Sequence, residues 1–390
     1  MSIDTLPPEL ASLRERLHAF LHDELLPAEK RAAVQEEADA PDDLRRWVRR
    51  RANALGFFRL LQPPELGGGG LGVLGQVALR EEIAASGAVL GRLVLGGTGG
   101  LLRHGTPEQR ERFLEPVLRG ELTAAFAFTD AREGPRTTAV RRGGAFALNG
   151  VKSFVSGGPH ADLLLTVATV TENGDGPTGS AVFVVPRQAP GLALRRELRT
   201  LDGGLHGVFS YDGVLVPEGD IIGGIGQGLP RALEDIAGLR LSVAASACGV
   251  ARWTLAYTLA QVDQPHRSGT PLAEREQVQA MFAESATDLY AARSALYATA
   301  RAAEAGASVE VEVAMAKSLA TEAVMRIVDR AIQLAGGAAV VEGHPLARLY
   351  REIRGWRIAE GTTEILRLTI ARGLLARHRA ERDANARPSG

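Results

Sequence analysis

The sequence predicts a multidomain α+β chain in which helical segments flank a central region of short strands. Apolar residues recur at helical spacing from residue 9 to about 122 and again from about 228 to 376. From about 123 to 222 the apolar period is two, with no helical stretch between the predicted strands. Such spacing favours an antiparallel barrel or sandwich over βαβ units. We therefore expect an N-terminal helical domain at 1–122, a middle β domain at 123–222 and a C-terminal helical domain at 223–390.

The N-terminal region is predicted to form helices joined by short loops. Its first helix has apolar residues about one turn apart until Pro27 interrupts the pattern. The run Pro63–Gly70 contains too many glycines for a helix or strand and is predicted to be a loop. Thr106-Pro107-Glu108-Gln109 has the N-cap, proline and N3 residues of a helix start.

The middle region alternates between apolar and polar residues. Ala145–Leu148 and Val151–Val155 flank Asn149-Gly150, a dipeptide typical of a type I′ hairpin turn. We therefore expect a hairpin here. The further strands are expected at 163–170, 181–185, 192–196 and 208–216.

The C-terminal region contains long alanine-rich segments with helical periodicity. They lie at 231–262, 272–304, 308–335 and 363–376. Four such segments are enough for a four-helix bundle. The tail after about residue 378 is charged and is expected to be frayed.

Composition excludes several classes of function. The 45 Lys and Arg residues nearly balance the 46 Asp and Glu residues, so neither nucleic acid nor an anionic membrane is expected as a main partner. The single cysteine, Cys248, excludes an intramolecular disulfide and a cysteine-rich metal site. His18 and His22 are one turn apart but lack a third ligand, so no metal site is predicted. No segment approaches the ~18 apolar residues of a membrane span, and a cytoplasmic protein is expected.

The strongest candidate for chemistry is a carboxylate on a glycine turn. Glu360 precedes Gly361, which allows the backbone to approach a ligand, and Thr362 or Thr363 is suited to cap the next helix. A carboxylate presented in this way can act as a base on a substrate held against the glycine. The same residues also fit a solvated glutamate before an ordinary helix start. The helix after the turn has an apolar face formed by Ile365, Leu366, Leu368, Ile370, Leu374 and Leu375.

The chain resembles the acyl-CoA dehydrogenase family over nearly its whole length. The resemblance rests on Arg357–Ile365, on Gln333-Leu-Ala-Gly336-Gly337 before it, and on the α–β–α order. It implies a helical domain, a middle antiparallel β-barrel and a C-terminal four-helix bundle. It also implies an FAD enzyme that forms a trans-α,β double bond in an acyl-CoA or related acyl thioester. In that reaction Glu360 takes the α-proton and flavin N5 takes the hydride.

The resemblance also assigns residues to the flavin. Phe126-Ala-Phe128-Thr129 is similar to the family's flavin-contacting strand. In a segment similar to Lys-x-Trp-Ile-Thr, Phe154 replaces the Trp packed on the ring and Ser156 replaces the Thr that reaches N5. Taken alone, Phe154 also fits barrel core and Ser156 a polar hairpin end. The adenine, pyrophosphate and adenosine parts are assigned to Gln333, Gly336, Gly337, Thr362, Thr363 and Glu364.

Further residues are assigned to the substrate and the base. Arg240 matches an arginine that helps to hold the pantetheine part of the substrate, although an exposed helix arginine fits the sequence nearly as well. Gly361 is expected to lie against the substrate. The family's alternative position for the base is occupied here by Leu239, so Glu360 is the remaining candidate. Gly336 and Gly337 are also suited to end a helix, which is compatible with a flavin contact.

Two segments depart from the family pattern. Thr129–Arg136 lacks the Pro, Ser and Asp of Thr-Glu-Pro-x-x-Gly-Ser-Asp, in a loop that helps to bind flavin and CoA in this family. In Gln264–Leu272, Ser268 replaces a Phe and Pro265 replaces an Arg. Arg267 or His266 is then the candidate for contacting the pyrophosphate of the flavin.

These departures keep two alternatives open. One is a flavin-dependent monooxygenase or oxidase of the same fold, and the other is a non-catalytic scaffold whose flavin site has decayed. For the dehydrogenase, the resemblance implies an electron-transferring flavoprotein as electron acceptor. It also implies a homotetramer or homodimer, because the family shares its flavin between subunits.

Overall fold

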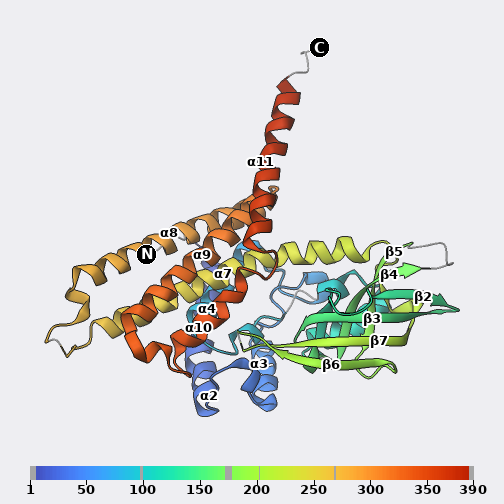
Figure 1. The fold of residues 1–390 in the computed structure, drawn as a ribbon, viewed down its shortest axis with the longest axis horizontal. Coiled ribbons are helices and arrows are strands. Elements are labelled where there is room, and N and C mark those ends of the chain that lie inside the picture. Colours follow the sequence, from blue (N-terminus) through green and yellow to red (C-terminus); the bar gives the residue numbers. More distant parts are fainter. Residues whose placement is uncertain (1–5, 97–99, 172–177, 202, 268, 386–390) are drawn as a thin grey trace. The chain divides into compact units, whose positions relative to one another are not determined.

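The helical and β regions follow one another in the predicted order (Figure 1). The computed structural model describes residues 6–96, 100–171, 178–201, 203–267 and 269–385. The chain divides into two compact units, each assembled from separate stretches of sequence. The helical unit contains the chain up to Gln35, Leu71–Arg92 and the chain from Ala237, whereas the mixed unit contains Glu36–Gly70 and Leu93–Ile236.

Helices form most of the helical unit. They are α1 (Pro8–Phe20), α2 (Leu26–Arg31), α4 (Val73–Ala85), α7 (Gly228–Val262, whose first residues belong to the mixed unit), α8 (Glu276–Glu304), α9 (Glu310–Ala335), α10 (Pro345–Trp356) and α11 (Thr363–Asn385). Helix α9 packs against α8, α10 and α11. Ala244, Ala245 and Ala247 of α7 are fully buried, and their small side chains allow neighbouring helices to approach closely.

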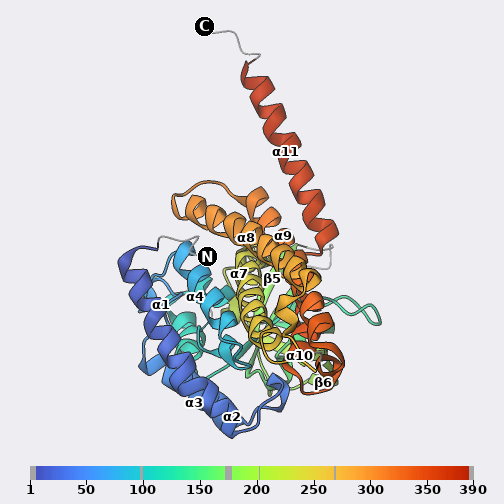
Figure 2. The ribbon, with the colours of Figure 1, turned by 90° about the vertical axis from the view of Figure 1, so that its left-hand side faces the viewer.

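The four long C-terminal helices lie where they were predicted, with two differences. Helix α10 was not predicted. Helix α11 continues to Asn385, so the tail predicted to be frayed after about residue 378 is helical as far as that residue, and 386–390 lie outside the described residues. Arg377 pairs with Glu312 of α9 through two contacts of 2.6 and 2.9 Å, which tie this part of α11 to its neighbour. In both views α11 (red) projects away from the other helices of its unit (Figure 1, Figure 2).

Pro27 does not end the first helical stretch, contrary to the sequence prediction. The turn before it, Leu21–Leu25, widens into a π-helix between α1 and α2. A proline clashes with the carbonyl four residues earlier and lacks an amide donor. The wider turn contains that residue, Asp23, and so accommodates the proline without a break.

The mixed unit combines short helices with a mixed β-sheet. The helices are α3 (Asp42–Ala54), α5 (Pro107–Gln109) and α6 (Glu115–Leu118). The strands are β1 (Ala124–Ala127), β2 (Thr138–Arg142), β3 (Ala145–Ser156), β4 (Leu163–Thr171), β5 (Gly179–Pro186), β6 (Leu192–Arg199), β7 (Leu205–Pro217) and β8 (Ile221–Ile222). Seven strands lie in the order β6-β7-β3-β2-β4-β5-β8, and β1 pairs with β4.

The middle of the sheet, at β4 and β5, is buried on both faces within the mixed unit. Leu164 and Ala168 of β4 belong to a core with aromatic residues of β3, β5 and β7. Leu163 and Leu165 point to the other face, which packs on Phe113 and neighbouring helical residues. The alternation of side chains along a strand explains this division. The pairs β1–β4 and β2–β4 are parallel, whereas the sequence predicted an antiparallel arrangement throughout.

The predicted hairpin at Asn149-Gly150 is absent, because β3 runs straight through these residues. The turn lies instead at Gly143-Gly144, between β2 and β3. Gly150 sits at an irregularity in the pairing with β7, and a Cβ there would lie 2.5 Å from Thr137 Cα. The glycine is therefore required by a close backbone approach and not by a hairpin turn.

The predicted helix start at Thr106 is confirmed. The Gln109 amide donates to Thr106 Oγ1 at 3.2 Å, and the Thr106 amide donates to Gln109 Oε1 at 2.9 Å. Gln109 Nε2 also donates to the carbonyl oxygens of Gly219 and Ile221. The Gln109 side chain therefore completes the capping box and also connects this helix to the start of β8.

Candidate active site

Glu360 lies on a short loop between α10 and α11 with an unusual backbone. Its φ is +55° and that of Gly361 is +103°, so two consecutive residues have positive φ. This conformation is costly for a residue with a Cβ and persists only where the surroundings hold it. The Thr362 hydroxyl accepts from the Ile365 amide at 3.3 Å and caps α11, as predicted.

Cationic side chains bind three consecutive carbonyls of this loop. Lys317 Nζ of α9 donates to the carbonyl oxygens of Ala359 at 2.9 Å and Gly361 at 2.8 Å. Arg240 Nε of α7 donates to the carbonyl oxygen of Glu360 itself at 3.0 Å. The loop is therefore fixed by two helices that lie more than 40 residues away in sequence.

The electrostatic surroundings make Glu360 a weaker acid than a free glutamate. Burial raises the pKa of Glu360 above its ordinary value of 4.5, while the charges of Lys317 and Arg240 lower it in part. Burial and the charge of Arg240 lower the pKa of Lys317 to about 8, and Glu360 opposes this shift. A partly buried carboxylate with a raised pKa and a fixed backbone is suited to general-base chemistry.

Several predicted residues of the helical unit lie together at this loop. They are Arg240 of α7, Glu360, Gly361 and Thr362 of the loop, and Thr363 at the start of α11. Thr363 is buried, and its Oγ1 has no hydrogen-bond partner within the described residues. Glu364, the next residue, is exposed. A buried hydroxyl without a partner is a position where a bound ligand can supply the missing hydrogen bond. Leu239 occupies the other position considered for a base and is 43% exposed. Its hydrocarbon side chain has no group that can accept a proton.

The remaining predicted residues of the helical unit lie elsewhere on it. Gln333 and the glycines Gly336 and Gly337 lie at and just beyond the C-terminal end of α9, and all three are exposed. A Cβ at either glycine would meet nothing within 4 Å, so there is open space beside them. Arg267 is exposed in the α7–α8 loop. Ser268, where the family has a Phe, lies outside the described residues.

The mixed unit gathers the predicted aromatic residues near the ends of β1 and β3. The rings of Phe126 and Phe128 are stacked, with centroids 5.6 Å apart. Phe154 has a φ of +54° at a pairing irregularity of β3, and its side chain is 62% exposed. Thr129 lies beside β3, because its carbonyl accepts from the Ser153 amide at 2.9 Å.

The hydroxyl of Ser156, which ends β3, is also exposed. Its Oγ lies 3.5 Å from His206 Nε2, and the His206 ring meets Phe154 edge-on at 6.4 Å. An exposed aromatic ring held in a strained conformation beside exposed hydroxyls is unusual for a strand, and strained residues concentrate at functional sites. These side chains fit the apolar wall and polar edge that a flavin ring requires.

Sequence reasoning gave no role to the two lysines that support these sites, Lys317 and Lys152, although Lys152 begins the segment matched to Lys-x-Trp-Ile-Thr. Lys152 is 2% exposed, and its Nζ donates to Phe128 O at 2.8 Å and Asp130 Oδ1 at 2.7 Å. Burial lowers the pKa of Lys152. Although burial raises the pKa of Asp130, the hydrogen bond and charge of Lys152 hold it below its usual value. The sequence signal for both lysines was a charged residue at a position expected to be apolar. Lys152 lies at an inward-facing position of a strand, and Lys317 lies on an alanine-rich helix face.

Phe154 should destabilise the unliganded protein relative to glycine. A glycine adopts positive φ without strain, and the exposed ring loses little packing when removed. We expect Phe154→Gly to raise the free energy of unfolding of the FAD-free protein by about 1 kcal/mol while weakening FAD binding. Urea unfolding and FAD titration measure the two effects. Unchanged FAD affinity would show that the ring does not contact the flavin.

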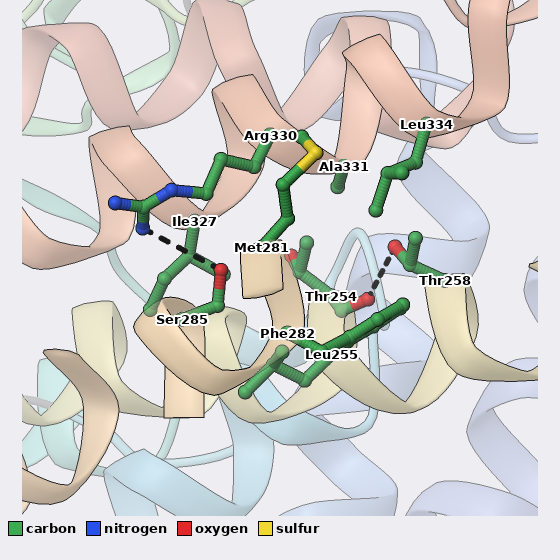
Figure 3. Close-up of a pocket in the computed structure, with 10 residues that line it drawn as sticks. All are labelled: Thr254, Leu255, Thr258, Met281, Phe282, Ser285, Ile327, Arg330, Ala331 and Leu334. Carbon is green, nitrogen blue, oxygen red and sulfur yellow. Dashed lines mark hydrogen bonds between the residues drawn. The ribbon is translucent and has the colours of Figure 1, made fainter. Parts of the chain in front are cut away.

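A small cavity lies between α7, α8 and α9 of the helical unit (Figure 3). Its volume is about 10 Å³, which is enough for about one water molecule. Thr254 lines it and is fully buried, and its Oγ1 has no partner within the described residues. The neighbouring Thr258 hydroxyl donates to the Thr254 carbonyl at 2.7 Å. This cavity suits a buried water and is too small for an acyl chain or a flavin.

Sequence models of one family match almost the entire chain. They are described as acyl-CoA dehydrogenase N-terminal, middle and C-terminal domains and match residues 7–121, 125–211 and 226–375. Over the part of the chain that the structure describes, no helix is long and apolar enough to cross a membrane.

Curated relatives are similar over most of their length. A 3-(aryl)acrylate reductase of Clostridium sporogenes is 31% identical over 356 residues, covering 88% of this chain and 93% of that protein. An acyl-CoA dehydrogenase of Bacillus subtilis is 30% identical over 380 residues, covering 94% and 98%. A cyclohexane-1-carbonyl-CoA dehydrogenase of Geobacter metallireducens is 32% identical over 359 residues, covering 89% and 94%.

Solved structures show the same fold. A putative acyl-CoA dehydrogenase from Mycobacterium smegmatis superposes with a TM-score of 0.84 at 28% identity, covering 95% of this chain and 98% of that one. The butyryl-CoA dehydrogenase of Megasphaera elsdenii superposes with a TM-score of 0.83 at 25% identity, covering 96% and 100%.

Proposed function

This chain belongs to the acyl-CoA dehydrogenase family, a family of flavoprotein oxidoreductases that act on CH–CH bonds, and from this premise we propose its reaction. We propose that it binds FAD and converts an acyl-CoA, or a related acyl thioester, to the trans-2-enoyl thioester. The observation that carries the proposal is Glu360, a partly buried carboxylate with a raised pKa on a loop held by Lys317 and Arg240.

In the proposed reaction Glu360 removes the α-proton of the thioester. Its raised pKa makes the carboxylate a stronger base than a free glutamate, so the proton transfer is less uphill. Gly361 lies beside it and lets the substrate approach the backbone. Arg240 holds the Glu360 carbonyl and is proposed to help orient the pantetheine part of the substrate. Bound FAD supplies the acceptor for the hydride that leaves the β-carbon.

We assign the flavin ring to Phe126, Phe128, Thr129, Phe154 and Ser156 of the mixed unit. The exposed ring of Phe154 and the exposed residues Thr129 and Ser156 support the assignment. The remainder of FAD is assigned to Arg267, Gln333, Gly336, Gly337, Thr362, Thr363 and Glu364. The open space beside the two glycines and the unpartnered Thr363 hydroxyl support this second assignment.

The direction of the reaction is part of the proposal, because some relatives are named as reductases. Besides the 3-(aryl)acrylate reductase, an acryloyl-CoA reductase (NADH) of Anaerotignum propionicum is 29% identical and covers 96% of this chain. The same Glu360 would return a proton to the α-carbon in the reverse reaction. We therefore include enoyl thioesters among the substrates to be tested.

We propose an electron-transferring flavoprotein as the electron acceptor. A relative from Acetobacterium woodii, 29% identical, is named as a subunit of a caffeyl-CoA reductase–Etf complex. We also propose a homodimer or homotetramer. Apolar side chains of α11 support this: Ile365, Leu368, Leu374 and Leu375 are each about half exposed, whereas Leu366 is buried. Helix α11 projects from the other helices of its unit (Figure 2), and we propose that these exposed apolar side chains pack against a second copy.

The visible spectrum of the FAD-loaded protein tests the proposal. Anaerobic titration with a panel of acyl-CoA esters should bleach the flavin with one class of acyl chain. Titration of the reduced protein with enoyl-CoA esters tests the reverse reaction in the same cuvette. Bound flavin that no thioester bleaches or reoxidises, together with rapid oxygen consumption on another substrate, would favour a monooxygenase or oxidase. A protein that takes up no FAD would contradict the proposal outright.

Flavin reduction should depend on pH through Glu360. Because burial raises its pKa above 4.5, we expect the rate to fall as the pH drops through a value above 4.5. The rate falls toward low pH because Glu360 must be deprotonated to act as a base, and protonation removes that activity. Rapid-mixing measurements of flavin reduction across pH give the apparent pKa. A rate that rises toward acidic pH would contradict this role.

A further inference from the structure

Lys317 is placed where an ammonium group is costly. It lies within α9, its side chain is fully buried, and its neighbours Ala314, Ala316 and Ala320 are buried as well. A buried charge requires hydrogen-bond partners to offset the loss of water. The acceptors of the Lys317 ammonium are the carbonyls of Ala359 and Gly361, one on each side of Glu360.

The conformation of Glu360 explains why such support is needed. Positive φ at a residue with a Cβ is strained and persists only where contacts determine it. Lys317 holds the peptide group before Glu360 and the one after Gly361, and Arg240 holds the carbonyl between them. With these three carbonyls bound, the backbone of Glu360 cannot relax to negative φ without breaking a hydrogen bond to a cation.

We propose that Lys317 is the positioning residue for the Glu360 carboxylate. Its ammonium group clamps the loop from inside the helical bundle and so sets the direction in which the carboxylate points. This inference rests on the proposed role of Glu360 as the base. Lys317 itself acts only through the backbone of the loop and does not take the proton.

The charge of Lys317 has a second consequence, which makes the role measurable. Lys317 from α9 and Arg240 from α7 both lower the pKa of Glu360, against the effect of burial. At the start of the same loop, Arg357 pairs with Glu322 of α9 at 2.7 Å, so those two charges largely neutralise each other. Removal of the Lys317 charge should therefore raise the pKa of Glu360 further.

The test is Lys317→Met, which replaces the ammonium by an apolar group of similar length that suits a buried site. We expect the FAD-loaded variant to reduce its flavin with acyl-CoA about 100-fold more slowly, as for a displaced catalytic group. Acyl-CoA affinity should change little, and the acidic limb of the pH–rate profile should move to higher pH. Hydrogen–deuterium exchange of the peptide 357–366, measured without substrate, should become faster.

A matched control lies one turn along the same helix. Thr321 is fully buried, and its hydroxyl donates to the Lys317 carbonyl at 2.9 Å. Thr321→Val removes a buried hydrogen bond of α9 without a contact to the loop. We expect it to lower Tm but to leave the rate, the pH profile and loop exchange unchanged. If Lys317→Met does not fold, Lys317→Gln keeps amide donors on a shorter side chain and should give intermediate values of all three.

Two results would overturn the inference. One is a folded Lys317→Met protein with the wild-type rate, pH profile and loop exchange, and the other is an equal loss of rate in Thr321→Val. Failure of the proposed function would look different. In that case a Glu360→Gln variant would still reduce its flavin, whereas the loop exchange of Lys317→Met would still report whether Lys317 holds the loop.

Discussion

Glu360→Gln should leave FAD bound and reduce the rate of flavin reduction by acyl-CoA about 10²- to 10⁴-fold. The substitution keeps the size and polarity of the side chain but removes its ability to accept a proton. The backbone contacts of the loop should survive, because Lys317 and Arg240 bind carbonyls and not the Glu360 side chain. The measurement is single-turnover flavin bleaching under anaerobic conditions, together with the flavin absorbance that reports bound FAD.

Glu342→Gln is the matched control for this experiment. Glu342 is an exposed acid of the helical unit, in the turn before α10. It should behave as wild type in binding FAD and in the rate of flavin reduction. Full activity in Glu360→Gln would refute the assignment of the base. Loss of FAD from that variant would indicate that the carboxylate has a structural role in cofactor binding.

Asp130→Ala should destabilise the mixed unit by about 3 kcal/mol, because it leaves the buried Lys152 ammonium without its counter-ion. Among the residues that the structure describes, Lys152 would then retain only the Phe128 carbonyl as hydrogen-bond partner. Asp130 Oδ1 also accepts from the Thr137 amide at 3.1 Å, so the start of β2 loses an anchor. We also expect weaker FAD binding, since the Phe128–Thr129 segment is held to β3 through this pair. Urea unfolding of the FAD-free protein and FAD titration measure the two effects.

The double substitution Asp130→Ala with Lys152→Met tests whether the loss of stability comes from the unpaired Lys152 charge or from the loss of the Asp130 side chain itself. When both partners are removed, no buried charge is left unpaired, and most of the lost stability should return. Glu133→Ala is the control, because Glu133 is exposed in the same loop. An Asp130→Ala protein as stable as the Glu133→Ala protein would contradict the role of the ion pair.

The order of domains was predictable because periodicity is a local property of sequence. The change from helical spacing to alternation near residue 123, and back near 228, needs no knowledge of distant contacts. The capping box at Thr106 and the cap of α11 at Thr362 were predictable for the same reason, since all their atoms lie within a few residues.

The errors arose where distant residues override local preference. Asn149-Gly150 is a strong hairpin signal, but Thr137, the residue before β2, approaches Gly150, and Asn149 Oδ1 accepts from the Gly213 amide at 2.9 Å. Pro27 is a strong stop signal, yet the packed residues Leu21 and Leu25 on the widened turn keep the helical stretch intact. In both cases tertiary packing decides between two locally acceptable backbones.

For the candidate site, the sequence by itself determined the residue types: a carboxylate before a glycine, a capping threonine, and aromatic residues on strands. Only the tertiary structure decided how they are held. Lys317 lies 43 positions before Glu360, and Lys152 lies 22 positions after Asp130. Neither contact is visible in a local pattern. The physical reason is that burial and long-range hydrogen bonds set both the positive φ of Glu360 and the direction of its pKa shift, and these exist only once the helices have packed.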